Sequence, residues 1–436
     1  MSDFQELPSR GQRAGRRRVG RWRAGLLIGT AAVLAACGSA SGSEQAAAPD
    51  PDDWDAVLAA ADGATLDLHM WGGSTEINRF VDEVYGPRLA EFGITLNRVP
   101  LADTADAVNT VLGELQAGRS SDGAIDVIWI NGENFTTMRQ ADALLEGWAE
   151  SLPNARLVDW EDPSVAFDAG RSVDGAESPW GSAQFQFVHD TARTDAADLP
   201  RSYAELADWI EANPGRFTYP APPAFHGTRF VKQWLYELAG GPDDFVGAFD
   251  EAAYEAAADE LFDVLDELRP SLWRGGETYP GDIAELDQLF ANGEVDLTFT
   301  QLPAGIDAQI DAGVFPSTAE PFVFDTGTIG DHHYLAVPVN AADPAAAMVF
   351  ADLVLEPALQ AMKLDPANGW GDGLAIAVDR LDADARAEVA SVLGGERATS
   401  VPQEELEAVR LPETRGAFTD RLDADWDRFV RQHQPR

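Results

Sequence analysis

The residues of this chain that could do chemistry do not form a recognisable catalytic set. The sequence contains no G-x-S-x-G elbow, no H-E-x-x-H motif and no phosphate-binding loop. His332 and His333 are adjacent, so in a strand they face opposite sides and are poorly placed to share a metal ion. Glu133 and Asp331 could form a glycosidase-like carboxylate pair, but with 74 acidic residues such a pairing is uninformative. We therefore expect no catalytic site, no metal and no cofactor.

The polar residues that remain follow strands that alternate with helices. Apolar patterns predict strands at residues 65–71, 94–99 and 125–130, each followed by a helix. From about residue 180 the pattern repeats, with strands at 184–189, 295–300 and 334–339. This alternation favours a parallel α/β sheet, and ligands of such sheets bind beyond the carboxyl ends of the strands.

The candidate ligand-binding residues lie mostly at those strand ends. The tryptophans among them could stack on a planar ligand or face a cation, or could simply pack in a core. The acidic residues could pair with an ammonium group or cap a helix, and the asparagines could bind ligand or form Asx turns. The backbone amides at residues 72–74 could equally bind an anion, so the sign of the ligand charge stays open. The set comprises Trp71, Gly72, Gly73, Ser74, Asp103, Asn131, Glu133, Asn134, Trp180, Gln184, Asp331 and Trp370.

Cys37 is the only cysteine, and its surroundings indicate export. It follows an apolar run of about 13 residues, which a stretch with seven arginines precedes. This is the layout of a secretory signal, and the run is too short to span a bilayer about 30 Å thick. The segment 34–37 resembles a bacterial lipobox, which implies that residues 1–36 are removed and that Cys37 carries a lipid. The alternative is an ordinary signal peptide with an incidental cysteine. Residues 37–53 read as a flexible tether.

The composition describes a large and strongly acidic globular protein. Hydrophobic residues make up 45% of the chain, which is enough for a packed core, and the length suits two lobes. The formal net charge is -43, and removing residues 1–36, which carry +5, would leave about -48. This charge repels nucleic acid, so we expect no nucleic-acid partner, and it could attract cationic ligands.

Several segments together resemble the bacterial extracellular solute-binding proteins of family 1, the ligand-capturing subunits of ABC importers. The similarity covers nearly all of residues 54–436 and is strongest to the Ynj-type subfamily. Together the segments are specific for that subfamily. They are residues 71–78, 102–108, 129–135, 179–185, 327–330 and 370–372.

The resemblance implies a bilobed α/β fold of the type II periplasmic-binding-protein kind, with the ligand held between two lobes. We expect residues 54–180 and 328–436 to form lobe 1 and residues 181–327 to form lobe 2. Hinge strands at 179–190 and 328–339 would join the lobes, and hinge bending would close them on the ligand. The implied partners are a small-molecule ligand, the permease and ATPase of an ABC importer, and the membrane through a lipid on Cys37.

The favoured hypothesis is an exported, monomeric lipoprotein without enzymatic activity, anchored on the extracytoplasmic face of the cell membrane. Its ligand would be a small organic cation or zwitterion, such as a polyamine or a thiamine-like compound. That preference rests on the aromatic and acidic candidates and on the overall charge. The alternatives are a sugar-binding version of the same fold, a secreted hydrolase, and a receptor or structural lipoprotein with no transport role.

Overall fold

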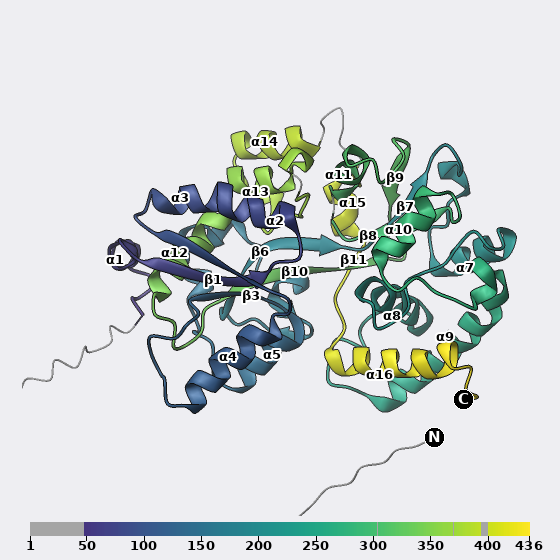
Figure 1. Ribbon diagram of the computed structural model, residues 1–436, viewed down its shortest axis with the longest axis horizontal. Helices are drawn as coiled ribbons and strands as arrows, with labels where there is room; N and C mark the ends of the chain where they lie inside the picture. Colours follow the sequence, from purple (N-terminus) through teal and green to yellow (C-terminus); the bar gives the residue numbers. More distant parts are fainter. Residues whose placement is uncertain (1–47, 303, 369, 394–399) are drawn as a thin grey trace, which may run out of the picture. The chain divides into compact units, whose positions relative to one another are not determined.

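The computed structural model describes residues 48–302, 304–368, 370–393 and 400–436 (Figure 1). The expected signal peptide, Cys37 and residues 38–47 of the expected tether lie outside these ranges. The first helix, α1 (Trp54–Ala61), starts where the sequence predicts, because the Asp53 side chain accepts a hydrogen bond from the Ala56 N–H.

The first sheet carries the strands that the sequence predicts near the amino terminus. β1 (Thr65–Trp71), β2 (Thr95–Leu101) and β3 (Val127–Ile130) are parallel, in the order β2-β1-β3. β10 (Thr328–Ala336) continues the sheet antiparallel to β3, so the sheet is mixed rather than parallel. β10 also pairs with β6 (Glu177–Gln184) and with the short β11 (Arg410–Leu411).

A second sheet has the order β8-β7-β9 and is antiparallel throughout. Its strands are β8 (Leu297–Thr300), β7 (Gln186–Asp190) and β9 (Ala319–Phe322). The strand predicted at 184–189 is therefore split between two sheets. The break falls at Phe185, whose N–H bonds to the Ile329 carbonyl on β10 and whose ring is fully buried in the second core. The chain thus crosses from one sheet to the other at this residue.

The helices cover the two sheets on both faces. Around the first sheet, α2, α3 and α12 lie on one face and α4 and α5 on the other (Figure 1). The helices of the first lobe are α2 (Thr75–Phe80), which continues through a π turn at Val81–Tyr85 into α3 (Gly86–Ala90), and α4 (Ala105–Gln116), α5 (Gly132–Gln140), α6 (Pro163–Ala166), α12 (Pro344–Val354), α13 (Pro357–Leu364) and α14 (Ala383–Leu393). Helix α15 (Gln403–Ala408) packs through Leu406 against Val323, which follows the second-sheet strand β9. The second sheet carries α7 (Tyr203–Ala212), α8 (Phe225–Ala239), α9 (Glu251–Leu268), α10 (Ile283–Ala291), α11 (Gly305–Asp311) and α16 (Gly416–Trp426). A short hairpin, β4 (Phe167–Asp168) and β5 (Arg171–Ser172), follows α6.

Separate hydrophobic cores form around the two sheets, and we call the surrounding structures the first and second lobes. The first lobe packs β1, β6 and β10 against α12, with Trp180 and Trp370 fully buried between them. The second lobe is rich in aromatic rings, among them Phe187, Phe230 and Phe299. Its core also contains the apolar face of α16, which the expected boundaries assigned to lobe 1. Helix α16 belongs there because its apolar side chains pack against α8 and α9.

In the part of the chain that the structure describes, no single helix is long and apolar enough to cross a membrane. Helices α12 and α13 would meet that test only as a pair, and they are bent by 67° from each other.

Candidate functional site

A pocket of about 540 Å³ lies between the two lobes, beside the crossing strand β10. We call it the interlobe pocket. The first lobe contributes residues around α6 and the β4–β5 hairpin, and the second lobe contributes the loop after α8. The lining residues are Asp162, Pro163, Ser164, Phe167, Gly170, Pro242, Asp243, Val246, Gly330, Asp331, Glu407, Arg410, Pro412 and Glu413.

The pairing of β10 explains why part of this strand is open to the pocket. On one edge β10 pairs with β6 along almost its whole length. On the other edge β3 pairs only with residues 334–336 and β11 only with residues 328 and 329. Among the described residues, no strand pairs with residues 330–333 on that edge. Gly330 and Asp331 can therefore form one wall of the pocket.

Behind that wall lies a group of four charged side chains and one amide that we call the arginine cluster: Arg229, Lys232, Asp331, Glu413 and Gln301. Arg229, on α8, is only 1% exposed and donates to Gln301 Oε1 at 2.7 Å, Asp331 Oδ2 at 2.7 Å and Glu413 Oε2 at 2.8 Å. Lys232 Nζ donates to Glu413 Oε1 at 2.5 Å. Burial alone would raise the pKa of Glu413, but the charges and hydrogen bonds of Lys232 and Arg229 outweigh it and lower the pKa to about 2. The cluster ties α8 to β10 and to the segment that leads into α16.

A buried acid lies next to this cluster on the side of the first lobe. Asp168, on β4, accepts a hydrogen bond from the Gly132 N–H at 2.6 Å. Burial, together with the charges of Asp331 and Glu413, raises the pKa of Asp168 to about 8 although the Gly132 N–H opposes the shift. Burial also raises the pKa of Glu177, on β6, well above its usual value. Asp168 is therefore mostly protonated at neutral pH.

The lining of the interlobe pocket combines an apolar platform with an excess of negative charge. Phe167 is 49% exposed, which is unusual for a phenylalanine on a short strand beside a cavity. Five carboxylate side chains and one cationic side chain, that of Arg410, line the pocket. Arg229 and Lys232 pair with two of these carboxylates, Asp331 and Glu413, so the negative side chains still outnumber all three cations. The Arg410 guanidinium contacts Asp162 at 3.4 Å and donates to Gln184 Oε1 at 3.2 Å. This combination suits a small ligand that is positively charged and partly apolar.

Comparison with known proteins identifies the family. The model of the bacterial extracellular solute-binding protein family matches residues 89–372. This chain belongs to that family. Protein YnjB of Escherichia coli K12 is 41% identical to the chain over 321 residues, which is 73% of this chain and 81% of YnjB. The chain is therefore a solute-binding protein of the ABC-transporter type, as its resemblance to the Ynj-type subfamily predicts, and the family's members are substrate-binding rather than enzymatic proteins.

Solved structures of solute-binding proteins share the bilobed fold. The spermidine/putrescine substrate-binding protein PotD of Streptococcus pneumoniae superposes with a TM-score of 0.57 at 13% identity, covering 84% of this chain and 98% of PotD. The TpPotD lipoprotein of Treponema pallidum gives 0.55 at 14% identity, covering 83% of this chain and 98% of that protein. At these identities the similarity establishes the fold, and the expected bilobed α/β architecture is confirmed.

Three of the residues expected to bind ligand lie at or beside the interlobe pocket of this solute-binding protein. Asp331 lines it directly. Gln184 is buried and joins it through Arg410. Glu133, near the start of α5, reaches across to the start of α16 at Gly416.

The other expected residues lie elsewhere. Trp180 and Trp370 are buried in the first core with ring centroids 5.5 Å apart, so in this arrangement neither presents a free face. Trp71 is 42% exposed, and its indole lies over Gly73, where a side chain would collide with it. Gly72 forms no part of the pocket lining; its N–H bonds to the Leu101 carbonyl.

The polar candidates outside the pocket take local roles at helix starts or lie on the surface. The Ser74 hydroxyl accepts from the Ile77 N–H and caps α2. Asp103 accepts from the Ala105 N–H at 2.9 Å, which is the alternative role weighed for it. Asn131 is exposed and Asn134 half-buried, and neither lines the interlobe pocket.

The sequence analysis did not identify Phe167 or Arg410, nor the two basic residues of the arginine cluster, Arg229 and Lys232. The sequence does carry a signal for these two basic residues. Arg229 and Lys232 are three residues apart on α8, so both lie on one face of a helix that also carries several large apolar side chains. Lys232 is also one of only two lysines in the chain. Buried basic residues call for carboxylate partners, but the sequence does not say which.

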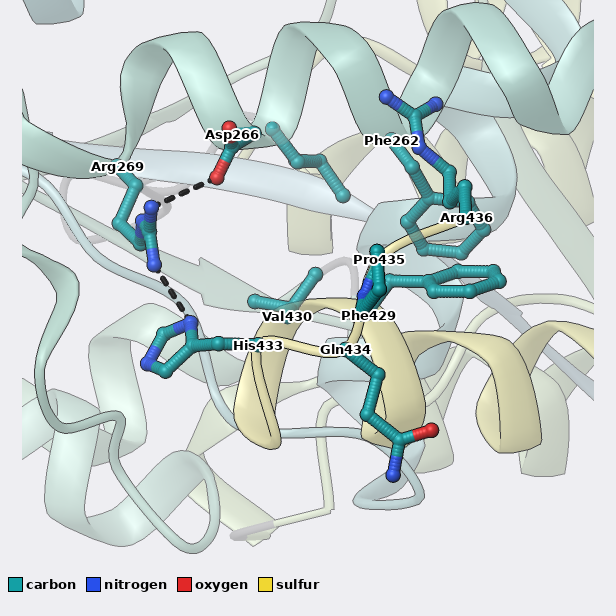
Figure 2. Close-up of a pocket in the computed structure, with 10 residues that line it drawn as sticks. Phe262, Asp266, Arg269, Phe429, Val430, His433, Gln434, Pro435 and Arg436 are labelled. Carbon is teal, nitrogen blue, oxygen red and sulfur yellow. Dashed lines mark hydrogen bonds and ion pairs between the residues drawn. The ribbon is translucent and has the colours of Figure 1, made fainter.

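A second pocket, of about 360 Å³, lies within the second lobe, at the carboxyl-terminal end of the chain (Figure 2). Phe262, Phe429 and Val430 form its apolar part, and Arg269 bonds both Asp266, at 2.7 Å, and His433, at 2.5 Å. Its charged groups pair with one another and no first-lobe residue lines it, so lobe closure would leave it unchanged. We therefore assign the candidate site to the interlobe pocket. Within the described ranges, no group of three or more metal-binding side chains occurs.

Proposed function

We propose that this chain captures a small organic cation or zwitterion in the interlobe pocket and delivers it to an ABC importer. The observation that carries the proposal is the lining of that pocket, where carboxylates surround the exposed ring of Phe167. An aromatic face attracts a cation by about 0.5 to 2 kcal/mol, depending on how far the cation is desolvated. The acidic side chains add Coulomb attraction.

The size of the pocket is compatible with this class of ligand. A volume of about 540 Å³ falls within the range of about 300 to 1,000 Å³ that small-molecule sites occupy. Arg410 at one side of the pocket offers a partner for a carboxylate, which is why a zwitterion stays within the proposed class.

The names of related proteins support this class only loosely. The pneumococcal relative is named for spermidine and putrescine, and a Trichodesmium relative is described with iron and citrate. Both share the fold at 13% identity or less, so their ligands do not transfer to this chain. The proposal rests on the charge of the pocket instead.

A sugar is the second candidate, because an exposed aromatic ring such as Phe167 is also a platform for sugar rings. Two substitutions separate the candidates. Asp243 is exposed in the pocket lining, so replacing it with asparagine removes charge and changes little else. The cation proposal expects D243N and F167A both to weaken binding, whereas a sugar site expects a loss from F167A alone.

The first experiment is thermal unfolding of the full chain against cations, zwitterions, sugars and oxyanions. A ligand at one hundred times its Kd stabilises the native state by about 2.7 kcal/mol. We expect a shift from a cationic or zwitterionic class, which D243N reduces and the distant surface variant E255Q leaves unchanged. A sugar as the only stabilising class, or a shift that D243N leaves intact, would refute the proposed ligand class.

We also propose that the chain is exported and held on the extracytoplasmic face of the membrane by a lipid on Cys37, as a monomer that docks on a permease–ATPase complex. The support is the sequence around Cys37, since this residue lies outside the described ranges. Cell fractionation tests the anchor. The parent chain should sediment with membranes and C37S should not, and equal membrane association of the two would refute it.

A further inference from the structure

Three contacts join the lobes through glycine residues. Gly170, at the tip of the β4–β5 hairpin, lies against the Val246 carbonyl in the loop after α8. Gly371, in the segment after α13, lies against Ala304, just before α11. Gly416, at the start of α16, lies against the side chain of Glu133 on α5. The Gly170 and Gly416 contacts each pair a residue of the first lobe with a residue of the second. At the Gly371 contact, Ala304, which leads into α11 of the second lobe, packs into the core of the first.

None of the three contacts leaves room for a side chain. A Cβ atom at Gly170 would lie 2.3 Å from the Val246 oxygen, and one at Gly371 would lie 2.8 Å from the Ala304 carbonyl carbon. Both obstacles are backbone atoms, which cannot rotate out of the way. A Cβ atom at Gly416 would lie 1.8 Å from Glu133 Oε1. A methyl group at these positions therefore has to displace one lobe from the other or, at Gly416, displace the glutamate.

The contacts lie on two sides of the crossing strands. Helices α13 and α11, which flank the Gly371 contact, are at the top of Figure 1, whereas α5 and α16, which meet at Gly416, are at the bottom. The upper contact includes a hydrogen bond from the Ala304 N–H to the Gly371 carbonyl at 3.1 Å. At the lower contact the Glu133 carboxylate lies at the amino terminus of α16, where a helix favours negative charge.

We propose that Gly170, Gly371 and Gly416 form a three-point latch that stabilises the closed arrangement of the two lobes. This role goes beyond ligand contact, because Gly371 and Gly416 do not line the interlobe pocket. The latch raises the fraction of molecules in the closed form. A substitution that lowers this fraction lowers the apparent affinity for any ligand of the closed form by the same factor. The three glycines are thus positioning residues.

The test measures the distance between the lobes without ligand, so its outcome does not depend on the proposed ligand class. In the full chain, C37S removes the only native cysteine, and Q116C and E255C place spin labels on exposed positions of α4 and α9. Double electron–electron resonance then gives the distribution of distances between the labels. We expect G170A and G371A each to shift this distribution to longer distances.

Two matched controls separate the contact from backbone strain. Gly147 and Gly313 both have φ +70°, close to +73° at Gly170 and +71° at Gly371, but a Cβ atom at either would meet nothing within 4 Å. An alanine at φ > 0 costs about 1 kcal/mol or somewhat more at all four positions. G147A and G313A should therefore lower the melting temperature about as much as G170A and G371A do, but should keep the distance distribution of the parent. Distributions for G170A and G371A that match these controls would overturn the proposal.

Gly416 provides a second test through rescue. Its backbone is helical, so an alanine there carries no φ penalty and should raise helix propensity. G416A should lengthen the distances by less than G371A does, because the obstacle is the end of the Glu133 side chain and can partly turn aside. Adding E133A should restore the parent distribution because the methyl group then has room. A double variant that stays as open as G416A would contradict the assigned contact.

Discussion

The arginine cluster makes a quantitative prediction about stability, because Glu413 is held ionised in a buried position. Its native-state pKa of about 2, against a usual value of 4.5, corresponds to about 3 kcal/mol of stability at neutral pH. This contribution is complete above pH 4.5, where the carboxylate is also ionised in the unfolded chain. It is lost as the pH falls toward 2, and at pH 3 about 1 kcal/mol remains. The variant E413Q removes the charge and should forfeit this contribution.

The assay is urea unfolding of the parent chain and E413Q at pH 7 and pH 3, followed by tryptophan fluorescence. E413Q should be less stable by about 3 kcal/mol at pH 7, in keeping with the cost of removing one partner from a buried ion pair, and by about 1 kcal/mol at pH 3. E255Q, an exposed substitution on α9, controls for the general loss of a negative charge. Equal stabilities at pH 7, or a gap that does not narrow at pH 3, would refute the ion pairing of Glu413 with Arg229 and Lys232.

Three further predictions concern other buried groups. The pKa of Asp168 is about 8 in the folded chain, against a usual 3.8, so the free energy of unfolding falls as the pH rises between these values. D168N should therefore melt at a higher temperature than the parent, by more at pH 9 than at pH 5. A difference in melting temperature that is the same at both pH values would argue against a buried neutral acid. W180A should lower the free energy of unfolding in urea by about 3 to 5 kcal/mol, because the Trp180 indole is fully buried. W71A should lower it by under about 1 kcal/mol, because the Trp71 indole is half-exposed. Comparable losses for the two variants would contradict the assignment of Trp180 to the core and Trp71 to the surface. The ammonium group of Lys363 is fully buried and lies 2.9 Å from the Asp372 carboxylate. K363M should lower the free energy of unfolding in urea by about 3 to 5 kcal/mol, because it leaves a buried carboxylate with one partner fewer. A free energy of unfolding unchanged within error would count against the ion pair.

The sequence located the strands of the first lobe well because their apolar pattern is a local property. β1 begins and ends where predicted, β2 is shifted by one residue at its start and two at its end, and β3 starts two residues late. The apolar pattern located the crossing strand β10 less well. β10 begins at residue 328, where the hinge segment implied by the resemblance begins, but six residues before the start that the apolar pattern predicts, because residues 328–333 include polar side chains. Pairing between strands that are far apart in sequence leaves no periodic signal in either one.

The candidate site shows the same limit. Asp331 was a candidate because it is an acidic residue in the hinge strand 328–339 that the resemblance implies, and it does line the pocket. Arg229 and Glu413, by contrast, are bonded across 184 positions of sequence, and no local feature pairs one with the other. Trp180 was expected near ligand because it lies in a segment that resembles the family and its ring could stack on a ligand, yet side chains from α12 and from the segment around Trp370 bury it. Burial is a tertiary property, and single residues do not reveal it.

The division of the cores along the chain has a consequence for the order of folding. The first lobe lacks β10 and α12 until the whole second sheet has been synthesised, and the second lobe lacks α16 until residue 426. The indole N–H of Trp426 bonds to the hydroxyl of Tyr219, so the last helix closes a core that began two hundred residues earlier. Neither half can complete its core as the chain emerges, and contacts of such long range form slowly. The nascent polypeptide therefore stays short of its native state until nearly every residue is present.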